Sequence, residues 1–380
     1  MKVLYDYQAF AMQRYGGVSN CFVRLIENLP SETTYEIALR ECNNIHLQQS
    51  RLGTFPPAKI DLDNFISTKY FFGRRTLFNL YSKVFPNGTS LGKNRRCSIE
   101  ALERGDFDVF HPTFFDTYFL EHLHGKPFVL TVHDMIPERF NWKIDRQMGQ
   151  KRELAGKAAH IVAVSQQTKR DLMEILGVPE EKITVIYHGV QDFPPVTSSP
   201  LVGGRYLLYV GHRKEQYKNF LPMMAQLKTV LKNHEDLKVV CTGPAFTKAE
   251  RQSFIQNGIE RQVVHVSPDD EGMRNLYKYA QCFIYPSLYE GFGIPILEAW
   301  QAGCPVLLNE TGCFPEIAAD AAVYFHLSKG CSDLTSVVED FLGKGKAERQ
   351  SLIARQFDRL RMFTWQDSAM SLNEVYMSII

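Results

Sequence analysis

Residues 285–305 read Tyr-Pro-Ser-Leu-Tyr-Glu-Gly-Phe-Gly-Ile-Pro-Ile-Leu-Glu-Ala-Trp-Gln-Ala-Gly-Cys-Pro. The short apolar run that ends at Tyr285 is typical of a buried strand, and Pro286 terminates it. Gly291 and Gly293 allow a tight turn and a close approach of the backbone to a ligand. Pro295 suits the first position of a helix, where its missing N–H costs nothing, and an apolar helical face follows. The segment therefore predicts a strand, a glycine-rich loop and a helix in succession.

The start of this predicted helix is a candidate anion site, because its free N–H groups and the positive end of its dipole meet the glycine loop. Glu290 precedes the turn, and Glu298 lies about one turn into the helix. A nucleotide sugar would suit this arrangement, with its phosphates at the dipole and a carboxylate at each end accepting hydrogen bonds from hydroxyl groups. The alternative is an ordinary helix with an acid in its first turn, which dipole complementarity alone would favour.

The two acids in this Gly-Phe-Gly-Ile-Pro context resemble the signature of the retaining glycosyltransferase family 4. Members of that family have the α/β fold called GT-B, in which two Rossmann-like, doubly wound parallel-sheet domains face a central cleft. The resemblance implies that Glu290 contacts the donor sugar and that Glu298 contacts the ribose hydroxyls. The remaining substrate-binding residues expected in this loop are Gly291, Phe292, Gly293 and Ile294.

Length and composition agree with a soluble protein of two domains. The chain has 380 residues, which exceeds the usual size of a single hydrophobic core. The formal net charge of +1 argues against a nucleic-acid binder that relies on bulk charge. Eight scattered cysteines without a Cys-x-x-Cys motif make metal and redox sites weak hypotheses and fit a reducing compartment. Since neither a signal sequence nor a membrane span is recognisable, we expect a cytoplasmic protein and leave a peripheral position on the inner membrane face open.

The alternation of strand-like and helix-like segments predicts the domain boundaries. Residues 1–193 form the expected acceptor-binding domain, and a linker with the sequence Phe-Pro-Pro-Val-Thr-Ser-Ser-Pro starts at Phe193. Residues 194–363 form the expected nucleotide-sugar-binding domain. The amphipathic segment 364–380 is expected to be a helix that crosses back to the first domain, as the GT-B fold implies.

The first domain contributes two candidate sites at strand ends, where open α/β sheets bind ligands. Gly16 and Gly17 open a predicted helix after the first strand, although a plain tight turn would explain them as well. His133 and Asp134 follow another predicted strand, and an ordinary loop histidine is the alternative there. The resemblance implies that the glycines lie near the donor diphosphate and the acceptor. It also implies that His133 reaches the donor sugar and diphosphate, with Asp134 orienting it or contacting acceptor hydroxyls.

Arg213 and Lys218 lie in the loop after the first strand of the second domain. Prepositioned cations stabilise the charge that develops on a leaving nucleoside diphosphate, whereas a solvated basic loop is the alternative explanation. Both residues resemble the phosphate-binding pair of the family. The triplets Asp61-Leu-Asp63 and Asp106-Phe-Asp108 resemble metal-binding motifs of another glycosyltransferase fold, but we interpret them as loop and strand-start residues. We therefore expect neither a metal nor a cofactor apart from the nucleotide sugar.

These residues together predict the transfer of a hexose from a UDP- or GDP-sugar to an acceptor hydroxyl with retention of the anomeric configuration. The resemblance implies that the departing phosphate oxygen takes the acceptor proton, and that the acceptor is a lipid-linked glycan in bacterial surface-polysaccharide or lipopolysaccharide synthesis. Two alternatives stay open: a GT-B-fold sugar-nucleotide epimerase and a non-catalytic nucleotide-sugar-binding protein.

Residues 64–99 have an unusual composition, with seven Lys or Arg residues and no Asp or Glu. Aromatic residues are interleaved with these cations. They are Phe65, Tyr70, Phe71, Phe72, Phe78, Tyr81 and Phe85. The segment is either a solvated basic face on two ordinary helices or a surface that docks on anionic lipid.

Overall fold

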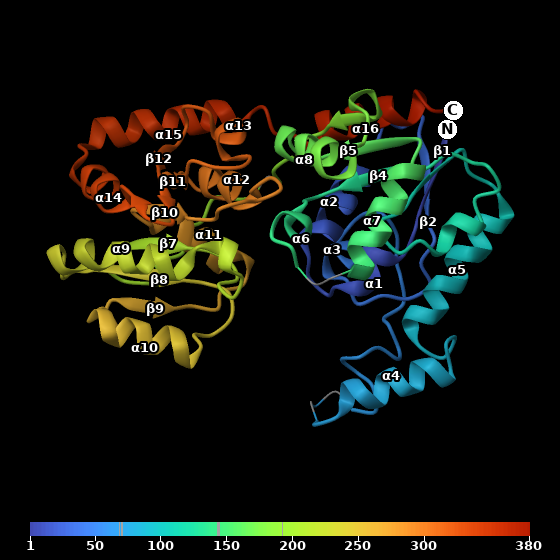
Figure 1. Cartoon of the computed structure of the whole chain (residues 1–380), viewed down its shortest axis with the longest axis horizontal. Helices are drawn as coiled ribbons and strands as arrows, with labels where there is room; N and C mark the ends of the chain where they lie inside the picture. Colours follow the sequence, from blue (N-terminus) through green and yellow to red (C-terminus); the bar gives the residue numbers. More distant parts are fainter. Residues whose placement is uncertain (68, 70, 143–144, 192) are drawn as a thin grey trace. The chain divides into compact units, whose positions relative to one another are not determined.

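The computed structural model describes residues 1–67, 69, 71–142, 145–191 and 193–380. The chain divides into two compact units (Figure 1). The first consists of Met1–Val164, Thr168–Gly189 and Trp365–Ile380, and the second consists of Ser165–Gln167 and Val190–Thr364. Among the described residues, none of the helices combines the length and the apolar character that a membrane span requires.

The strands of the first unit are all parallel. One group has the order β2-β1-β3, formed by β1 (Lys2–Tyr5), β2 (Thr34–Ile37) and β3 (Val109–His111). The other has the order β4-β5-β6, formed by β4 (Val129–Val132), β5 (His160–Ala163) and β6 (Ile183–Val185). A parallel bridge between Phe110 and Phe128 joins the two groups. Every residue of β3 and β4 is buried, as expected for strands with helices on both faces.

The first unit also contains helices, most of which cover these strands (Figure 1). They are α1 (Gln8–Met12), α2 (Gly17–Glu27), α3 (Ile45–Gln48), α4 (Arg74–Val84), α5 (Ser90–Arg104), α6 (Ile136–Arg139), α7 (Asp145–Lys157), α8 (Gln166–Leu176) and α16 (Trp365–Met377). The last of them packs into the core of the first unit: the hydroxyl of Tyr376 lies 2.8 Å from that of Tyr5 and 2.5 Å from Nδ1 of His111. Nε2 of His111 lies 2.9 Å from the hydroxyl of Thr131. This polar chain links α16 to three strands inside the core.

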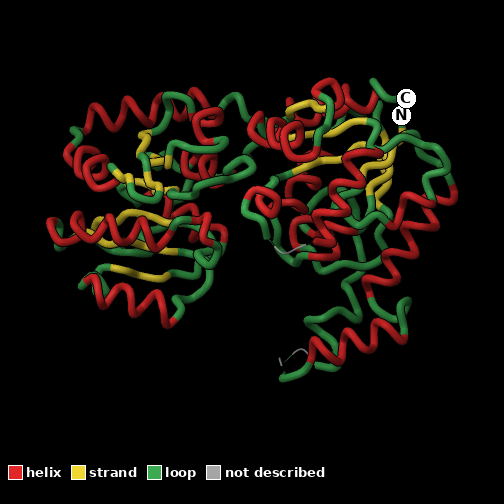
Figure 2. Tube along the Cα trace, in the orientation of Figure 1, coloured by secondary structure: helices red, strands yellow, loops and turns green. Residues whose placement is uncertain are grey.

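The second unit has one six-stranded parallel sheet of order β12-β11-β10-β7-β8-β9 (yellow in Figure 2). Its strands are β7 (Arg205–Tyr209), β8 (Leu237–Cys241), β9 (Val263–His265), β10 (Cys282–Tyr285), β11 (Val306–Asn309) and β12 (Val323–Phe325). A small hairpin joins β13 (Leu327–Ser328) to β14 (Cys331–Ser332). This order is that of a doubly wound sheet, and it reverses between β7 and β10.

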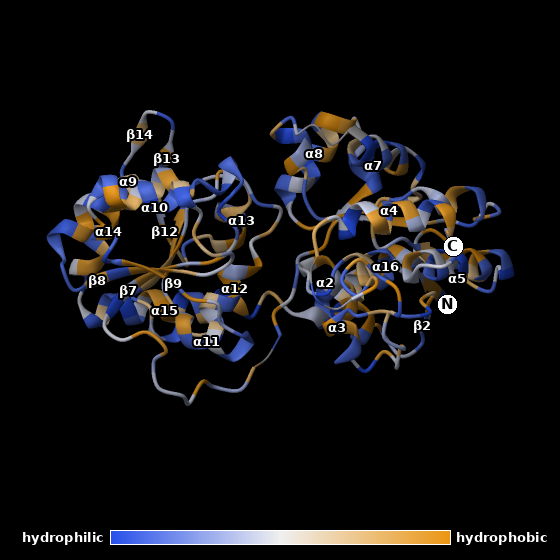
Figure 3. Ribbon diagram, turned by 90° about the horizontal axis from the view of Figure 1, so that it is seen from below, coloured by the Kyte–Doolittle hydropathy of each residue, from blue (hydrophilic) through white to orange (hydrophobic). Residues whose placement is uncertain are grey.

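The helices of the second unit are α9 (Phe220–Asn233), α10 (Lys248–Asn257), α11 (Asp270–Tyr279), α12 (Ile294–Gln301), α13 (Phe314–Ala318), α14 (Leu334–Gly343) and α15 (Lys346–Leu360). In Figure 3 the strands around β7 and β8 are hydrophobic, whereas α10 on the outside is largely hydrophilic. Apolar side chains of the strands and of the inward-facing sides of the helices therefore form the core, and the outer sides of the helices carry the polar surface.

The predicted α/β fold with parallel, doubly wound sheets is confirmed in both units. The segment 285–305 forms β10, a loop and α12, as its composition indicates. The helix begins one residue earlier than expected, so that Pro295 occupies its second position. Strand β2 was not predicted, because the polar–apolar alternation of Thr-Tyr-Glu-Ile extends over only four residues.

Candidate functional site

Lys218 and Glu290 meet at the point where the strand order of the second unit reverses. Lys218 ends a short 3₁₀ turn (Gln216–Lys218) after β7, and Glu290 lies in the loop after β10. The Lys218 ammonium lies 2.7 Å from Oε1 of Glu290, and the two side chains are only 17 % and 10 % exposed. Open α/β sheets bind their ligands at this position, outside the carboxyl ends of the strands. The structure thus brings together two residues that the sequence indicated separately.

Tyrosine rings surround this ion pair. The Lys218 ammonium lies 5.1 Å from the ring centroid of Tyr217 and 6.0 Å from that of Tyr285. Burial and then the charge of Glu290 raise the pKa of Tyr285, so its hydroxyl keeps its proton near neutral pH and is a hydrogen-bond donor to Glu290. The aromatic walls lower the local dielectric, which strengthens the interaction of these charges with an ionic ligand.

The loop from Gly291 to Gly293 requires glycine at its end. Gly293 has φ +97° and caps α12, and a Cβ atom there would lie 3.1 Å from Cδ1 of Ile296 and 3.3 Å from the ring of Phe314. Phe292 is buried and packs edge-on against Phe363 at 5.9 Å. Ile294 is the first residue of the helix. The glycine loop is therefore a rigid element at the start of α12.

Cys313 supports this loop and was not predicted as a site residue. Its thiol lies 3.3 Å from the carbonyl oxygen of Glu290 and 3.2 Å from that of Phe292. Its sequence position, 23 residues after Glu290, carries no signal of this contact. The thiol holds the backbone on which the candidate carboxylate is mounted.

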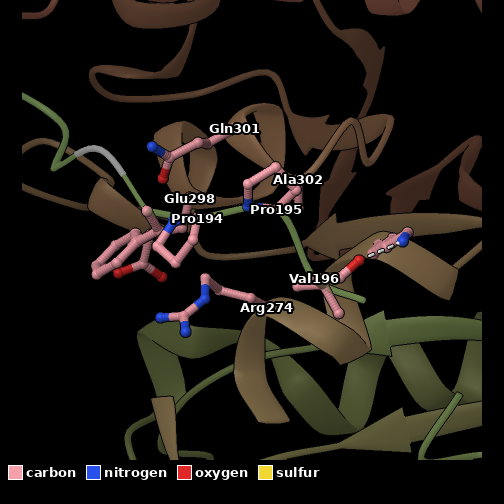
Figure 4. Close-up of a pocket in the computed structure, with 9 residues that line it drawn as sticks. Pro194, Pro195, Val196, Arg274, Glu298, Gln301 and Ala302 are labelled. Carbon is pink, nitrogen blue, oxygen red and sulfur yellow. Dashed lines mark hydrogen bonds between the residues drawn. The ribbon is translucent and has the colours of Figure 1, made fainter. Parts of the chain in front are cut away.

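Glu298 lies on the side of α12 that faces α11 and lines a pocket of about 230 Å³ (Figure 4). Burial of its carboxyl group raises the pKa of Glu298, and the hydroxyl of Tyr277 donates to its Oε2 atom at 3.3 Å. Arg274 and Lys278 of α11 share this pocket with the linker residues 193–196. The volume is below the roughly 300–1,000 Å³ of sites for drug-sized ligands and fits part of a ligand such as one sugar ring.

The linker forms one wall of this pocket because α11 and α12 hold it in place. Lys278 donates to the carbonyl oxygen of Val196 at 2.6 Å, the bond drawn as a dashed line in Figure 4. Gln301 donates to the carbonyl oxygen of Gln191 at 2.7 Å. The guanidinium of Arg274 stacks on Phe193 at 4.6 Å, and its Nε atom is buried without a hydrogen-bond partner in the part of the chain that the structure describes. Sequence reasoning missed Arg274 and Lys278, since helix α11 shows only ordinary charged residues.

Arg213 is already engaged within the second unit. Its Nε atom donates to Glu250 at 2.8 Å, Nη1 donates to the carbonyl oxygen of Thr242 at 2.6 Å, and Nη2 contacts the carbonyl oxygen of Pro244. The side chain is 3 % exposed and lies over the ring of Phe246 at 4.8 Å. Arg213, which we predicted to bind phosphate together with Lys218, therefore joins the loops after β7 and β8.

In the first unit, Gly16 and Gly17 stand at the start of α2, as predicted. Gly16 is the residue before the helix, and its carbonyl oxygen accepts from the hydroxyl of Ser19 at 2.9 Å and from the amide of Asn20 at 3.1 Å. A Cβ atom at Gly17 would have no neighbour within 4 Å, whereas one at Gly16 would clash with Oε1 of Gln13. This geometry leaves room for a ligand close to the backbone of Gly17.

His133 directly follows β4, and its ring stacks on that of His188 with a centroid distance of 5.7 Å. Burial and then the charge of Lys151 lower the pKa of His133 to about 4, so the ring is neutral near pH 7. Its Nε2 atom is buried and has no hydrogen-bond partner among the described residues. A buried imidazole nitrogen of this kind is available to a ligand hydroxyl or a metal ion.

Cys21, His133 and His188 form the group that could hold a metal ion in the described part of the chain. One ligand atom from each lies within 4.8 Å of the others, and Sγ of Cys21 is 3.4 Å from Nδ1 of His188. Burial lowers the pKa of His188 to about 3 and raises that of the Cys21 thiol. The imidazoles are therefore ready to bind a borderline metal such as zinc, whereas the thiol would first have to lose its proton.

The loop that carries His133 and Asp134 is fixed by a buried ion pair that sequence reasoning missed. Lys151 of α7 lies 3.0 Å from Glu138 of α6, and both side chains are almost fully buried. The same ammonium donates to the backbone carbonyl of Asp134 at 3.1 Å. Oδ1 of Asp134 accepts from the amide of Ile136 at 3.0 Å, so this carboxylate oxygen shapes the turn into α6.

Both Asp-x-Asp triplets have structural partners. Asp61 accepts from the amides of Asp63 and Asn64 at 3.0 and 2.9 Å and thereby closes a turn. Asp106 and Asp108 accept from the side chain and the amide of Lys2 at 2.8 and 2.7 Å, directly before β3. These contacts agree with the interpretation of both triplets as loop and strand-start residues.

Comparison with known proteins places the two parts of the chain in related families. Residues 15–192 match the family described as Glycosyltransferase Family 4, and residues 198–354 match Glycosyl transferases group 1. The structure of HepE from Anabaena, solved in complex with UDP and glucose, is similar to this chain, and the match covers 99 % of each of the two chains. Its TM-score is 0.70 and its sequence identity is 15 %, which establishes a common fold.

Two relatives of known name are mannosyltransferases. The O-antigen chain mannosyltransferase RfbU of Salmonella typhimurium is 27 % identical over 201 residues, which are 51 % of this chain and 55 % of the relative. The GDP-mannose:cellobiosyl-diphosphopolyprenol alpha-mannosyltransferase of Xanthomonas oryzae pv. oryzae is 27 % identical over 233 residues, which are 59 % of this chain and 60 % of the relative. The chain thus matches somewhat more than half the length of these relatives.

Proposed function

Because this chain belongs to glycosyltransferase family 4 and has the GT-B fold, we propose that it transfers a hexose from a UDP- or GDP-sugar to a hydroxyl group of a lipid-linked oligosaccharide, with retention of configuration. The observation that carries the proposal is the largely buried Lys218–Glu290 pair at the reversal of strand order in the second unit. A cation and a carboxylate at this place offer one partner for a diphosphate and one for sugar hydroxyls.

Each candidate site residue of the second unit has a role in the proposed reaction. Lys218 faces the diphosphate and stabilises the charge that develops on it as the sugar leaves. Glu290 accepts hydrogen bonds from the donor sugar, and the rigid loop from Gly291 to Ile294 holds it in place. Glu298, in its 230 Å³ pocket, receives the ribose hydroxyls. We assign Arg213 to the diphosphate as well, acting through the loop that its bonds to Glu250 and Thr242 hold in shape.

The reaction needs no covalent intermediate on the protein. The acceptor oxygen forms a bond to the anomeric carbon, and the bond between that carbon and the phosphate oxygen breaks. Its electron pair stays with the nucleoside diphosphate, whose oxygen takes the acceptor proton. Lys218 supplies the positive charge that a divalent cation would otherwise provide, so we propose that transfer is independent of metal.

The first unit contributes Gly16, Gly17, His133 and Asp134 to the binding of acceptor and diphosphate. The neutral imidazole of His133, with its unpaired buried nitrogen, supports such a role because it can bond a hydroxyl group without bringing a charge. The buried Lys151–Glu138 pair keeps this loop in one conformation.

GDP-mannose is the first donor to test. Both named relatives are mannosyltransferases, and the name of one contains GDP-mannose and a diphosphopolyprenol-linked acceptor. UDP-glucose is the second donor, because UDP and glucose occur in the structure of HepE. The same names support a place in surface-polysaccharide synthesis, and we propose that the protein acts on the cytoplasmic side.

The test has a binding part and a transfer part. Thermal melting with a panel of nucleotide sugars identifies the donor, since a ligand at 100 times its Kd stabilises the folded protein by about 2.7 kcal/mol. Labelled donor is then incubated with polyprenyl-diphosphate oligosaccharides, and the anomeric configuration of the product is read by NMR. The Lys218→Ala and Glu290→Gln variants are the controls.

Acceptor-dependent release of the nucleotide with a retained product supports the proposal. Nucleotide release or epimerisation of the donor without any acceptor would point to an epimerase, and donor binding without turnover under all conditions would point to a binding protein. Either result overturns the proposed transfer.

A further inference from the structure

Helix α4 lies at one end of the first unit, apart from its strands (light blue in Figure 1). The surrounding residues 64–99 contain seven Lys or Arg residues and no Asp or Glu. Apolar side chains are exposed on this helix and at both of its ends: Phe72 before it is 97 % exposed, and Phe85 after it is 56 % exposed. A projecting element that is both apolar and cationic is a candidate interaction surface.

The inner side of this element has its own small aromatic core. The ring of Phe65 packs against Phe78 at 5.3 Å and against Tyr81 at 5.2 Å, and Tyr81 packs against Phe85 at 5.2 Å. Several aromatic residues that the sequence offered for lipid binding thus hold the segment together instead. Tyr70 lies outside the described residues.

Arg74 also belongs to the inner side, although the basic composition of residues 64–99 made it a candidate for the docking surface. Its side chain is buried, and its guanidinium donates to the backbone carbonyls of Asp63 and Ser67, both at 2.8 Å, and of Lys69 at 2.6 Å. The side chain fixes the turn that precedes α4, so it is not available to an external anion.

The outer face of α4 is the remaining candidate for an interaction surface. Leu77, Leu80 and Val84 are spaced by three and four residues, so they lie on one side of the helix, and they are 47–60 % exposed. Arg75 and Lys83 are also exposed, but on the polar sides of the helix, about 170° and about 90° around it from the apolar side chains. We call the exposed surface formed by Phe72, Leu77, Leu80, Val84 and Phe85, together with Arg75 and Lys83, the α4 face.

We propose that the α4 face docks on an anionic lipid bilayer, with its apolar side chains in the interface and its cations at the headgroups. The charge pattern selects this occupant: the segment has cations and no acids, so it complements an anionic surface, whereas a second copy of the same face would present like charges. The small aromatic core keeps the helix presented in the absence of lipid. This proposal concerns where the protein binds and does not depend on the transfer reaction.

The test is co-sedimentation of the full chain with vesicles of phosphatidylcholine alone and of phosphatidylcholine mixed with phosphatidylglycerol, at low and high ionic strength, without donor or acceptor. We expect binding to the anionic vesicles only, and weaker binding at high salt because the Debye length shortens. Replacing Arg75 and Lys83 by Glu should lower the partition coefficient by about fivefold or more for each cation removed. Leu80→Ser with Val84→Ser should also lower it.

Matched controls separate the α4 face from general charge and hydrophobicity. Lys232→Glu with Lys248→Glu makes the same change in net charge on exposed residues of α9 and α10, and Ile255→Ser removes an exposed apolar side chain of α10. These variants should bind the anionic vesicles like the wild type. Because all the substituted side chains are exposed, folding should be kept, and circular dichroism checks it.

Three outcomes would overturn the proposal. The protein stays in the supernatant with both kinds of vesicle, or the control variants lose binding as strongly as the α4 variants. The third outcome is a dimer in sedimentation velocity that the Leu80→Ser and Val84→Ser changes dissociate, which would assign the α4 face to self-association.

Discussion

Lys218 and Glu290 are 72 residues apart in sequence, yet their charged groups are 2.7 Å apart. The contact arises because β7 and β10 are neighbours in the sheet, with Leu207 opposite Cys282 and Leu208 opposite Phe283. Each residue follows its strand by a short loop, so both loops emerge at the same edge. The pair is the best-defined feature of the candidate site.

Lys218→Ala and Arg213→Ala should both lower turnover by about 10²–10³-fold, as expected for the loss of a group that stabilises charge in the transition state. Their effects on stability should differ. The Arg213 side chain is 3 % exposed and bonded to Glu250, so its removal should cost about 3–5 kcal/mol of unfolding free energy, whereas Lys218→Ala should cost less. Steady-state kinetics and urea unfolding measure the two effects. Wild-type kinetics in both variants would refute the phosphate assignment.

Glu290→Gln and Glu298→Ala should separate sugar transfer from nucleotide binding. Gln keeps the shape of Glu290 but removes the charge that pairs with Lys218, so kcat should fall while the Kd for the nucleoside diphosphate changes little. Glu298→Ala removes the carboxyl group from its pocket. Because one polar contact to the nucleotide is lost, nucleotide affinity should fall about tenfold. Isothermal titration with GDP and UDP checks this division, and equal losses of affinity in both variants contradict it.

Gly293→Ala should destabilise the second unit. The residue has φ +97°, a conformation that costs an L-residue about 1–2 kcal/mol, and the new methyl group would press against Ile296 and Phe314. Gly17→Ala is the matched control for stability, because a Cβ atom there meets nothing within 4 Å and alanine favours a helix. Chemical denaturation of both variants is the measurement. An unchanged midpoint for Gly293→Ala would show that the loop does not require glycine.

His111 should make the first unit sensitive to acid. Burial, and then the charge of His133, lowers the pKa of His111 to about 3 in the folded protein, against about 6.5 in the unfolded chain. Below pH 6.5 the unfolded state therefore binds a proton that the folded state does not, and stability is lost as the pH falls towards 3. The difference in unfolding free energy between wild type and His111→Gln should shrink by about 1.4 kcal/mol per pH unit in this window.

Urea unfolding of both proteins between pH 7 and pH 5 measures that difference, and other titrating groups cancel because they occur in both. A difference that is independent of pH would mean that His111 is protonated in the folded state or titrates equally in both states.

Transfer activity should survive a strong chelator, since Lys218 supplies the positive charge at the diphosphate. The cluster of Cys21, His133 and His188 makes a direct check necessary. Elemental analysis before and after chelation shows whether a metal is bound, and Cys21→Ser removes the sulfur ligand. Activity that is lost on chelation and restored by manganese or zinc would refute metal independence.

Much of the second unit could be read from the sequence. The strand, glycine loop and helix of residues 285–305 are local structures, and local composition specifies them: proline ends the strand, Gly293 supplies the positive φ, and Pro295 lies in the first turn of the helix. The alternation of strands and helices also predicted a parallel sheet, since parallel strands need helical crossovers. Strand β2 was not predicted because four residues are too few to distinguish its alternation from chance.

What the sequence determined about this protein is therefore its local structure and the kinds of residue present at the strand ends. Which of them meet was decided only by the tertiary structure, because contacts between distant segments depend on strand order and on packing. The fold brought Lys218 to Glu290, engaged Arg213 with Glu250, buried the side chain of Arg74 at the start of α4, and gathered Cys21, His133 and His188 from three separate segments. Residue spacing carries no information on such contacts, because the free energy that selects them comes from burying side chains of the whole unit together.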